Sequence, residues 1–147
     1  MMQLAAQSAG AAQWQPADYE AIFASSAPAR HCLIAQQAER AIGFIVMREL
    51  EGVWELENLA VPAELRRQGI ATLLLLEMLA LAAARAAKII FLEVRESNHA
   101  ARALYEHNGF TLTGRRTSYY SQPLEDALIY RFTLSFPQPE KIVIEPR

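Results

Sequence analysis

The segment from residue 53 to residue 94 constrains the fold more than any other part of the chain. It contains an apolar, strand-like run over 53–61, good helix formers over 68–87, and a short apolar run over 88–94. A strand, a crossover helix and a strand imply that the two strands pair in parallel through a right-handed connection. The nearly continuous apolar sequence of the second run is typical of a central strand covered on both faces.

Antiparallel strands are expected on both sides of this unit. Two apolar runs before it predict a hairpin that continues into 53–61 as a meander, and Gly43 indicates a bulge or a close backbone approach. After it, Ser97 or Asn98 begins a second helix, which ends near His107 before Asn108-Gly109. The expected strands are 31–37, 41–47, 53–61, 88–94, 110–117 and 127–136. The prediction is an α+β fold with a twisted, mixed but mostly antiparallel sheet and helices on both faces.

The length of 147 residues fits a single domain. Its core is expected over 31–136. The preceding segment, 1–30, is interpreted as a loose arm rich in Ala and Gln, followed by one short helix capped by Asp18. The final segment, 137–147, contains three prolines and is interpreted as an appendage.

Composition excludes several kinds of partner. Lys and Arg number 14 against 16 Asp and Glu, so no basic excess is available for nucleic-acid phosphates. Cys32 is the only cysteine, which excludes an intramolecular disulfide and a multi-thiolate zinc site and favours a cytoplasmic setting. The three histidines lack metal-ligand spacing, so no metal is expected. The longest apolar stretch, 70–84, is shorter than the roughly 20 residues of a membrane span, so no membrane partner is expected.

The hexapeptide 66–71 (RRQGIA) has the character of an anion site. Small residues at positions 69 and 71 let a ligand approach the main chain, while unpaired N–H groups and the helix dipole attract a phosphate or pyrophosphate. No lysine follows the glycine and there is no GxGxxG, which disfavours nucleoside triphosphates and NAD. A solvated, basic helix start is the alternative interpretation.

Four sequence blocks follow one another along the chain: 56–61 (LENLAV), 66–71 (RRQGIA), 92–98 (LEVRESN) and 103–110 (ALYEHNGF). Together they resemble the GNAT acetyltransferases, and within these the RimI-type N-terminal acetyltransferases. The resemblance covers about residues 31–136 and implies a single GNAT-type domain that moves an acetyl group from acetyl-CoA to a primary amine. A protein N-terminal amine is the expected acceptor, and the protein is expected to be a monomer or weak dimer. The alternatives are a small-molecule amine, a lysine side chain, or a non-catalytic acetyl-CoA-binding module.

The resemblance also implies where acetyl-CoA binds. The main chain of 59–61 would pair with the pantetheine arm, and the loop 66–72 would hold the pyrophosphate. Asn98 and Tyr105 would lie near the thiol end of acetyl-CoA, and the alternative interpretations are a helix cap for Asn98 and a core aromatic for Tyr105. The implied residues are Leu59, Ala60, Val61, Arg66, Arg67, Gln68, Gly69, Ile70, Ala71, Thr72, Asn98 and Tyr105.

Acetyl transfer to an amine requires a base, because an amine near its free pKa is mostly protonated at pH 7. Glu93 lies near the carboxyl end of an apolar strand, where desolvation makes a carboxylate a better proton acceptor, and it matches the family's general base. A structural ion pair is the alternative, its possible partners being Arg95, Arg102 and Arg115. By the same resemblance, Tyr105 would protonate the departing CoA thiolate.

The acceptor side is predicted from two further patterns. Glu55 and Glu57 are two apart on one strand and so point to one face, and Glu55 is the reserve candidate for the base. The stretch 115–120 (RRTSYY) resembles the family's R-R-x-Y-Y peptide-binding segment but has one extra residue. An exposed strand face and a plain hairpin are the respective alternatives. The predicted acceptor-side residues are Glu55, Glu57, Arg115, Tyr119 and Tyr120. The segment 1–30 is short for the family, in which it shapes one wall of the acceptor cleft.

Overall fold

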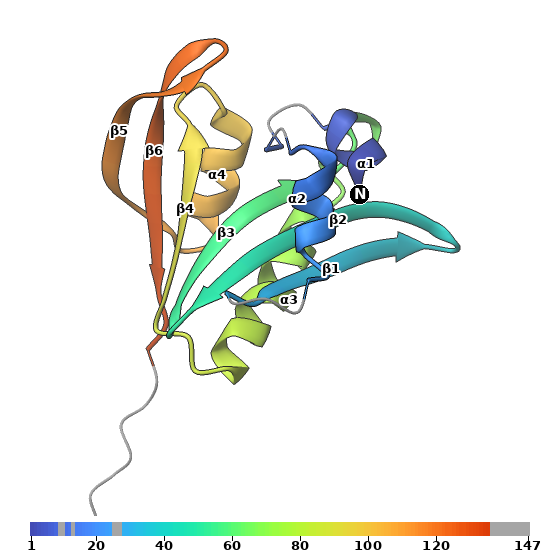
Figure 1. Cartoon of the computed structure of the whole chain (residues 1–147), viewed down its shortest axis with the longest axis horizontal. Helices are drawn as coiled ribbons and strands as arrows, with labels where there is room; N and C mark the ends of the chain where they lie inside the picture. Colours follow the sequence, from blue (N-terminus) through green and yellow to red (C-terminus); the bar gives the residue numbers. More distant parts are fainter. Residues whose placement is uncertain (9–10, 13, 25–27, 136–147) are drawn as a thin grey trace, which may run out of the picture.

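The structure is a computed structural model that describes residues 1–8, 11–12, 14–24 and 28–135 (Figure 1). The expected appendage 137–147 and the last residue of the expected core lie outside this range. The elements, in chain order, are α1 (Met2–Ala6), α2 (Pro16–Ala21), β1 (Arg30–Gln37), β2 (Arg40–Leu50), β3 (Val53–Ala60), the 3-10 turn η1 (Ala63–Leu65), α3 (Ile70–Ala84), β4 (Ile89–Arg95), α4 (His99–His107), β5 (Thr111–Ser121) and β6 (Leu124–Thr133).

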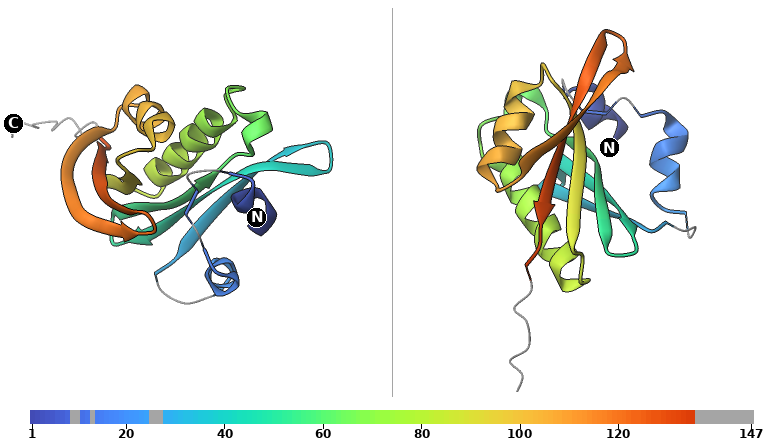
Figure 2. Two further views of the ribbon diagram at one scale, coloured as in Figure 1. Left: turned by 90° about the horizontal axis from the view of Figure 1, so that it is seen from above. Right: turned by 90° about the vertical axis from the view of Figure 1, so that its left-hand side faces the viewer.

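Six strands form one sheet in the order β1-β2-β3-β4-β6-β5. The β3–β4 pair is parallel and the other neighbouring pairs are antiparallel, which confirms the mixed α+β sheet. Helices α3 and α4 cover one face, while the two N-terminal helices lie against the other (Figure 2). The last strand of the chain, β6, lies between β4 and β5 in the sheet. The hairpin of β5 and β6 therefore extends the sheet beyond the β3–α3–β4 unit.

Strands β3 and β4 pair over a short distance and then separate. Their register runs from Val53 opposite Ile89 to Leu56 opposite Leu92. Beyond that point β3 carries a bulge, because Val46 pairs with Asn58 and Met47 with Leu56, which leaves Glu57 as the extra residue. The carboxyl-terminal halves of the two strands diverge visibly in Figure 1. The sheet therefore opens at the edge where both parallel strands end.

The bulge also divides the core. Leu56 packs in the larger cluster under α3, whereas Ala60 packs in the smaller cluster under the N-terminal helices. In a regular strand these residues, four apart, would share a face. The larger cluster contains the fully buried Trp54 of β3 and Leu75 of α3, together with other side chains from α3 and β4. One extra residue in β3 thus lets a single strand contribute to both clusters.

The N-terminal prediction was wrong in two respects. The arm expected to be loose contains helix α1, whose Leu4 is buried in the smaller cluster. Asp18 is not the cap of α2: Gln15 is, and the Asp18 carboxylate lies at the third helical position and accepts a hydrogen bond of 2.7 Å from the Gln15 N–H. Pro16 occupies the first turn, where its fixed φ favours a helix start. The helix α2 therefore begins closer to the N-terminus than predicted.

The ends of several elements also differ from the prediction. The last strand begins at Leu124 and ends at Thr133, three residues earlier than expected at each end, because the turn before it falls at Gln122-Pro123. The long helix begins at Ile70, after Gly69 in the left-handed region, and ends at Ala84, shortly before Ala86 with its positive φ. Asn98 caps α4 and Gly109 follows its end with φ 89°, as expected.

We expect Gly43→Ala to lower the free energy of unfolding by about 1–3 kcal/mol. An added Cβ would lie 3.1 Å from the Ala60 carbonyl oxygen and 3.2 Å from side-chain carbons of Ile70 and Leu74. The backbone oxygen cannot move away cheaply, because β3 is held by β2. Urea denaturation measures the change.

The matched control is Gly114→Ala on β5. Its added Cβ would meet only the Ile129 side chain, at 3.4 Å or more, so we expect a change within about 0.5 kcal/mol. Equal stability of Gly43→Ala and wild type would contradict the close packing of β2 against β3 and α3.

Candidate active site

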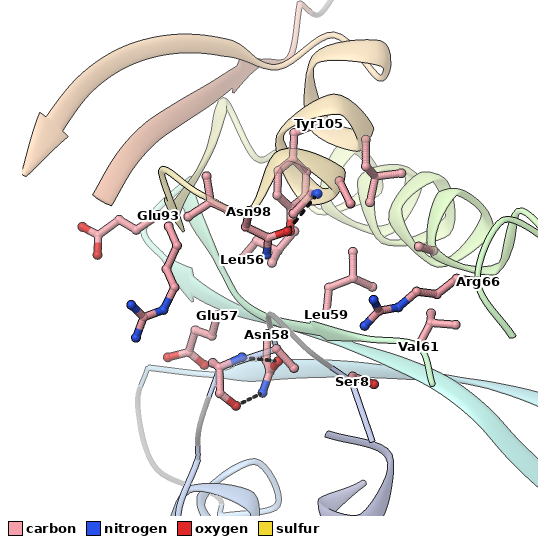
Figure 3. Close-up of a pocket in the computed structure, with 18 of the residues that line it drawn as sticks. Ser8, Leu56, Glu57, Asn58, Leu59, Val61, Arg66, Glu93, Asn98 and Tyr105 are labelled. Carbon is pink, nitrogen blue, oxygen red and sulfur yellow. Dashed lines mark hydrogen bonds between the residues drawn. The ribbon is translucent and has the colours of Figure 1, made fainter. Parts of the chain in front are cut away.

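A cavity of about 760 Å³ occupies the opening between β3 and β4. Figure 3 shows Arg66 and Glu93 at opposite ends of it, with Asn98 and Tyr105 of the α4 region on one side and Glu57 and Asn58 of β3 on the other. The remaining lining comes from the start of α3, from the N-terminal segment and from β5. The ends of the parallel strands and the starts of the helices that follow them therefore meet in one concave site.

The predicted cofactor residues line this cavity except for Ala60 and Gln68. The Ala60 side chain is buried in the smaller cluster, on the other side of the sheet, and Gln68 is exposed. The backbone of Gly69 has φ 80°, and a Cβ added there would meet nothing within 4 Å. The first turn of α3, which follows directly, has N–H groups without intrahelical partners. This end of the cavity is suited to an anion.

Asn98 and Tyr105 have structural contacts and also line the cavity. The Asn98 side-chain oxygen accepts a hydrogen bond of 3.2 Å from the Ala101 N–H, which makes it the cap of α4, and Asn98 also lines the cavity. Tyr105 is 6% exposed and packs against Phe110, with ring centroids 5.6 Å apart. Burial raises the pKa of the Tyr105 hydroxyl, so this group keeps its proton beside the cavity.

Glu93 lies at the other end of the cavity, where its side chain is 13% exposed. Its carboxylate pairs with Arg116, at 2.6 Å from the guanidinium Nε, and accepts a hydrogen bond from the Tyr119 hydroxyl. The three arginines expected as its partners are engaged elsewhere: Arg95 binds Glu125, Arg102 donates to the Glu96 carbonyl, and Arg115 binds Glu96 and Asp126. The prediction of these three partners was wrong, because it did not include the bulge that bends β5 and brings Arg116 to Glu93.

The bend is a bulge in β5 that spans three residues. Arg116 pairs with Ala127 and Tyr120 with Glu125, so residues 117–119 stand opposite Asp126 alone. Ser118 has φ 51°, and its N–H donates a hydrogen bond of 2.8 Å to the Asp126 side chain. The extra residue that separates RRTSYY from the family's R-R-x-Y-Y is therefore absorbed in this bulge.

The bulge directs two tyrosines to the cavity and leaves one predicted residue out. Tyr119 and Tyr120 both line the cavity, and the Arg95 guanidinium lies 4.0 Å from the centroid of the Tyr120 ring. Arg115 does not line the cavity, and its guanidinium forms ion pairs with Glu96 and Asp126. Arg116, its neighbour, is the arginine that meets Glu93.

Glu55 and Glu57 line the cavity as part of a four-residue charge cluster. Glu57 accepts hydrogen bonds of 2.7 and 3.0 Å from Arg30. Arg48 binds Glu55 and lies 3.6 Å from Glu57, so the two carboxylates share one guanidinium. Both acids are therefore charge-balanced by arginines of β1 and β2 before any ligand binds.

Sequence reasoning missed the residues that attach the N-terminal segment to the site. The amide of Asn58, 2% exposed, accepts a hydrogen bond of 3.2 Å from the Ala12 N–H and donates one of 3.4 Å to the Ala12 carbonyl oxygen. Ser8, Ala11, Ala12 and Trp14 line the cavity. An asparagine inside the apolar block LENLAV was the available signal, since a buried amide needs partners.

The described residues contain no group of three or more His, Cys, Asp or Glu side chains placed to hold a metal ion. Among their helices, none has the length and apolar character that a membrane crossing needs.

Comparison with known proteins gives one family. The model of the acetyltransferase (GNAT) family matches residues 1–110. The N-alpha-acetyltransferase RimI of Mycobacterium tuberculosis is 31% identical over 122 residues, which are 80% of this chain and 74% of that protein. The ribosomal-protein-S18-alanine N-acetyltransferase of Escherichia coli superposes with a TM-score of 0.84 at 25% identity, over 97% of this chain and 90% of that one. A GNAT family acetyltransferase from Elizabethkingia anophelis, solved with acetyl-CoA bound, has a TM-score of 0.70 at 20% identity, over 82% and 84% of the two chains.

The Tyr119–Glu93 hydrogen bond predicts a specific alkaline sensitivity. This bond and, secondarily, burial raise the pKa of Tyr119 from 10.0 to about 12. Because the native pKa lies above the unfolded value, the neutral phenol stabilises the fold fully below pH 10, and this contribution is lost as the pH rises from 10 to 12. We therefore expect the free energy of unfolding to fall less steeply across this window in Tyr119→Phe than in wild type.

Urea denaturation at several pH values within the window measures the difference. Glu93→Gln, which removes the carboxylate, should flatten the same decline. Identical alkaline slopes in wild type and Tyr119→Phe would show that the phenol is not bound to Glu93.

Proposed function

Since the chain belongs to the GNAT family of acetyltransferases, we propose that it moves the acetyl group of acetyl-CoA to the α-amine at a protein N-terminus. It is an acetyl-CoA-dependent N-acetyltransferase, as the resemblance in the sequence predicted. The observation that carries the acceptor is the likeness, along nearly the whole chain, to an enzyme named for acetylating a ribosomal-protein alanine. Ribosomal proteins are made in the cytoplasm, so we place the reaction there.

The residues at the α3 end of the cavity fit acetyl-CoA. Gly69 leaves open space above the first turn of α3, and Thr72 and the arginines at 66 and 67 line the cavity around it. We assign the pyrophosphate to this turn. The edge of β3 beyond Leu56 does not pair with β4, so the main chain of 59–61 can bond the pantetheine amides. When bound, acetyl-CoA supplies a thioester carbonyl that an amine can attack.

We assign the proton transfers to Glu93 and Tyr105. Glu93 accepts a proton from the acceptor ammonium, directly or through a water, and the freed nitrogen lone pair forms the new C–N bond. As the C–S bond breaks, the Tyr105 hydroxyl gives its proton to the departing sulfur. Its raised pKa keeps it protonated until that moment. Glu55 stays the second candidate for the base, and its pairing with the less exposed Arg48 makes it the weaker one.

We assign the acceptor to the part of the cavity between β5 and the N-terminal segment. Tyr119, Tyr120 and Glu57 line the cavity, as do Ala12 and Trp14 of the N-terminal segment. In this proposal the segment 1–30, although short, is part of the single domain and closes the acceptor side. Arg115 then supports the hairpin through its two ion pairs and does not contact the acceptor.

A competition among acceptors tests the function. We expect a peptide with a free N-terminal Ala to give a kcat/KM about tenfold or more above that of a polyamine or of the same peptide with a blocked N-terminus and an internal lysine. Release of CoA measures turnover. A polyamine that wins would establish a small-molecule enzyme, and binding of acetyl-CoA without turnover of any acceptor would establish a non-catalytic module.

Glu93→Gln belongs in the same assay. We expect it to lower kcat for the preferred acceptor by about 10²–10⁴-fold while changing the Kd of acetyl-CoA by no more than about twofold. Full activity of this variant would remove Glu93 from the mechanism and leave Glu55 as the base.

Gly69→Asn tests the pyrophosphate site without straining the backbone, because Asn tolerates the left-handed region. Its side chain would extend into the open space above the α3 turn, so we expect the Kd of acetyl-CoA to rise about tenfold or more, as measured by calorimetry.

Gly52→Asn is the matched control for this substitution. Gly52 also has a positive φ, 85°, and open space, but it lies in the β2–β3 turn, outside the cavity lining. We expect its Kd to stay within about twofold of wild type. An unchanged Kd in Gly69→Asn would mean that the pyrophosphate binds elsewhere.

A further inference from the structure

We propose that Arg116 is a displaceable counter-ion of Glu93, and that the cationic amine of the acceptor takes its place on that carboxylate. This inference rests on the proposed function, in which Glu93 is the base. It assigns to Arg116 a positioning and selecting role in the reaction: the residue holds the carboxylate of the base in place until an ammonium group arrives.

The burial of Glu93 creates the need for a counter-ion. Its side chain is 13% exposed, and a carboxylate withdrawn from water to that extent requires compensating charge or hydrogen bonds. Arg116 supplies the charge, at 2.6 Å, and Tyr119 supplies a hydrogen bond. The charge of the base is therefore compensated before the acceptor binds, and an arriving ammonium competes with Arg116 for the same carboxylate.

Arg116 is the group that can leave at the smaller cost. Its side chain is 54% exposed, and its charge is matched by one carboxylate, that of Glu93. Arg48, by contrast, is 32% exposed and lies between Glu55 and Glu57, and Arg115 binds both Glu96 and Asp126. A half-exposed arginine regains water readily when it is displaced, whereas an arginine bridging two acids would leave both uncompensated.

The bulge in β5 is what brings Arg116 and Tyr119 to the same carboxylate. Residues three apart on a regular strand point to opposite faces. The bulge over 117–119, fixed by the bond from the Ser118 N–H to Asp126, changes this alternation. The Arg116 guanidinium then lies 5.5 Å from the centroid of the Tyr119 ring, and both side chains reach Glu93. The bulge thus brings two side chains of β5 to the carboxylate of the base.

The exchange makes the reaction selective for an amine that arrives protonated. One cation replaces another, so Glu93 keeps a balanced charge, and Tyr119 can continue to orient it. The bound ammonium then breaks an N–H bond, the proton forms an O–H bond on Glu93, and the nitrogen keeps the electron pair for the attack. In the resting enzyme Arg116 competes for the site, so the apparent Kd of the acceptor equals its intrinsic Kd divided by the fraction of open pairs.

Calorimetry on the CoA-loaded protein tests the exchange. The titrants are a peptide with a free N-terminal Ala and the same peptide with a formylated N-terminus. We expect Arg116→Gln to tighten binding of the free-amine peptide about twofold to fivefold and to leave the formylated peptide unaffected. With acetyl-CoA, KM for the free-amine peptide should fall by the same factor while kcat changes by less than about twofold. Arg116→Lys, which keeps the competing charge, should behave as wild type.

Two further proteins separate this exchange from general effects. Arg40→Gln removes an equally charged residue from an exposed ion pair with Glu64, at 3.6 Å and outside the cavity lining, and should not change the affinity. In a Glu93→Gln background, Arg116→Gln should lose its effect, because the shared carboxylate is gone.

Each possible outcome of the titration either supports or overturns the exchange of Arg116 for the ammonium group. Weaker binding of the free-amine peptide to Arg116→Gln would make Arg116 a direct contact of the peptide and overturn the exchange, and equal binding would also overturn it. If the free-amine peptide binds neither wild type nor Arg116→Gln, the proposed acceptor is wrong and the exchange falls with it.

Discussion

The parallel pairing of β3 with β4 ends at Leu56 and Leu92, and the cavity occupies the space that their separation leaves. Peptide groups on the inner edges of two parting strands need hydrogen-bond partners, since buried backbone groups are seldom left unpaired. A pantetheine arm with its own amides can satisfy them. The bulge at Glu57 accompanies the separation and turns Asn58 and Ala60 toward the N-terminal side. The cavity and the attachment of the N-terminal segment thus depend on one departure from regular pairing.

The end of the cavity that we assign to the acceptor contains acids that already have arginine partners. Glu55 and Glu57 share Arg48, Glu93 has Arg116, and Glu125, which binds Arg95, fixes the hairpin beside them. Such pairing lets carboxylates stand close together in a partly buried site without strong mutual repulsion. These pairs differ in how firmly they are held. Only a pair with an exposed, singly engaged arginine can be opened at small cost.

Much of this fold followed from the sequence because its strongest signals are local. The run of helix formers after 53–61 and the apolar strand 88–94 specified the parallel unit, and the blocks around Gly69 and Asn98 specified the family. The partner of Glu93 could not be predicted in this way. Strand alternation fails at a bulge, and whether an extra residue bulges or shifts the register depends on the neighbouring strand. The N-terminal segment was equally obscure, because its short helices are stabilised by packing on the sheet and hardly by their own propensity.

The attachment of Ala12 to Asn58 has a consequence for how this molecule can diversify. The half of the cavity that we assign to acetyl-CoA is made of central strands and the start of α3, whose side chains are shared with the main core. The opposite wall is a short peptide segment pinned through one amide on a strand bulge. Substitutions in that segment can reshape the recognition of new targets while the reactive machinery stays intact.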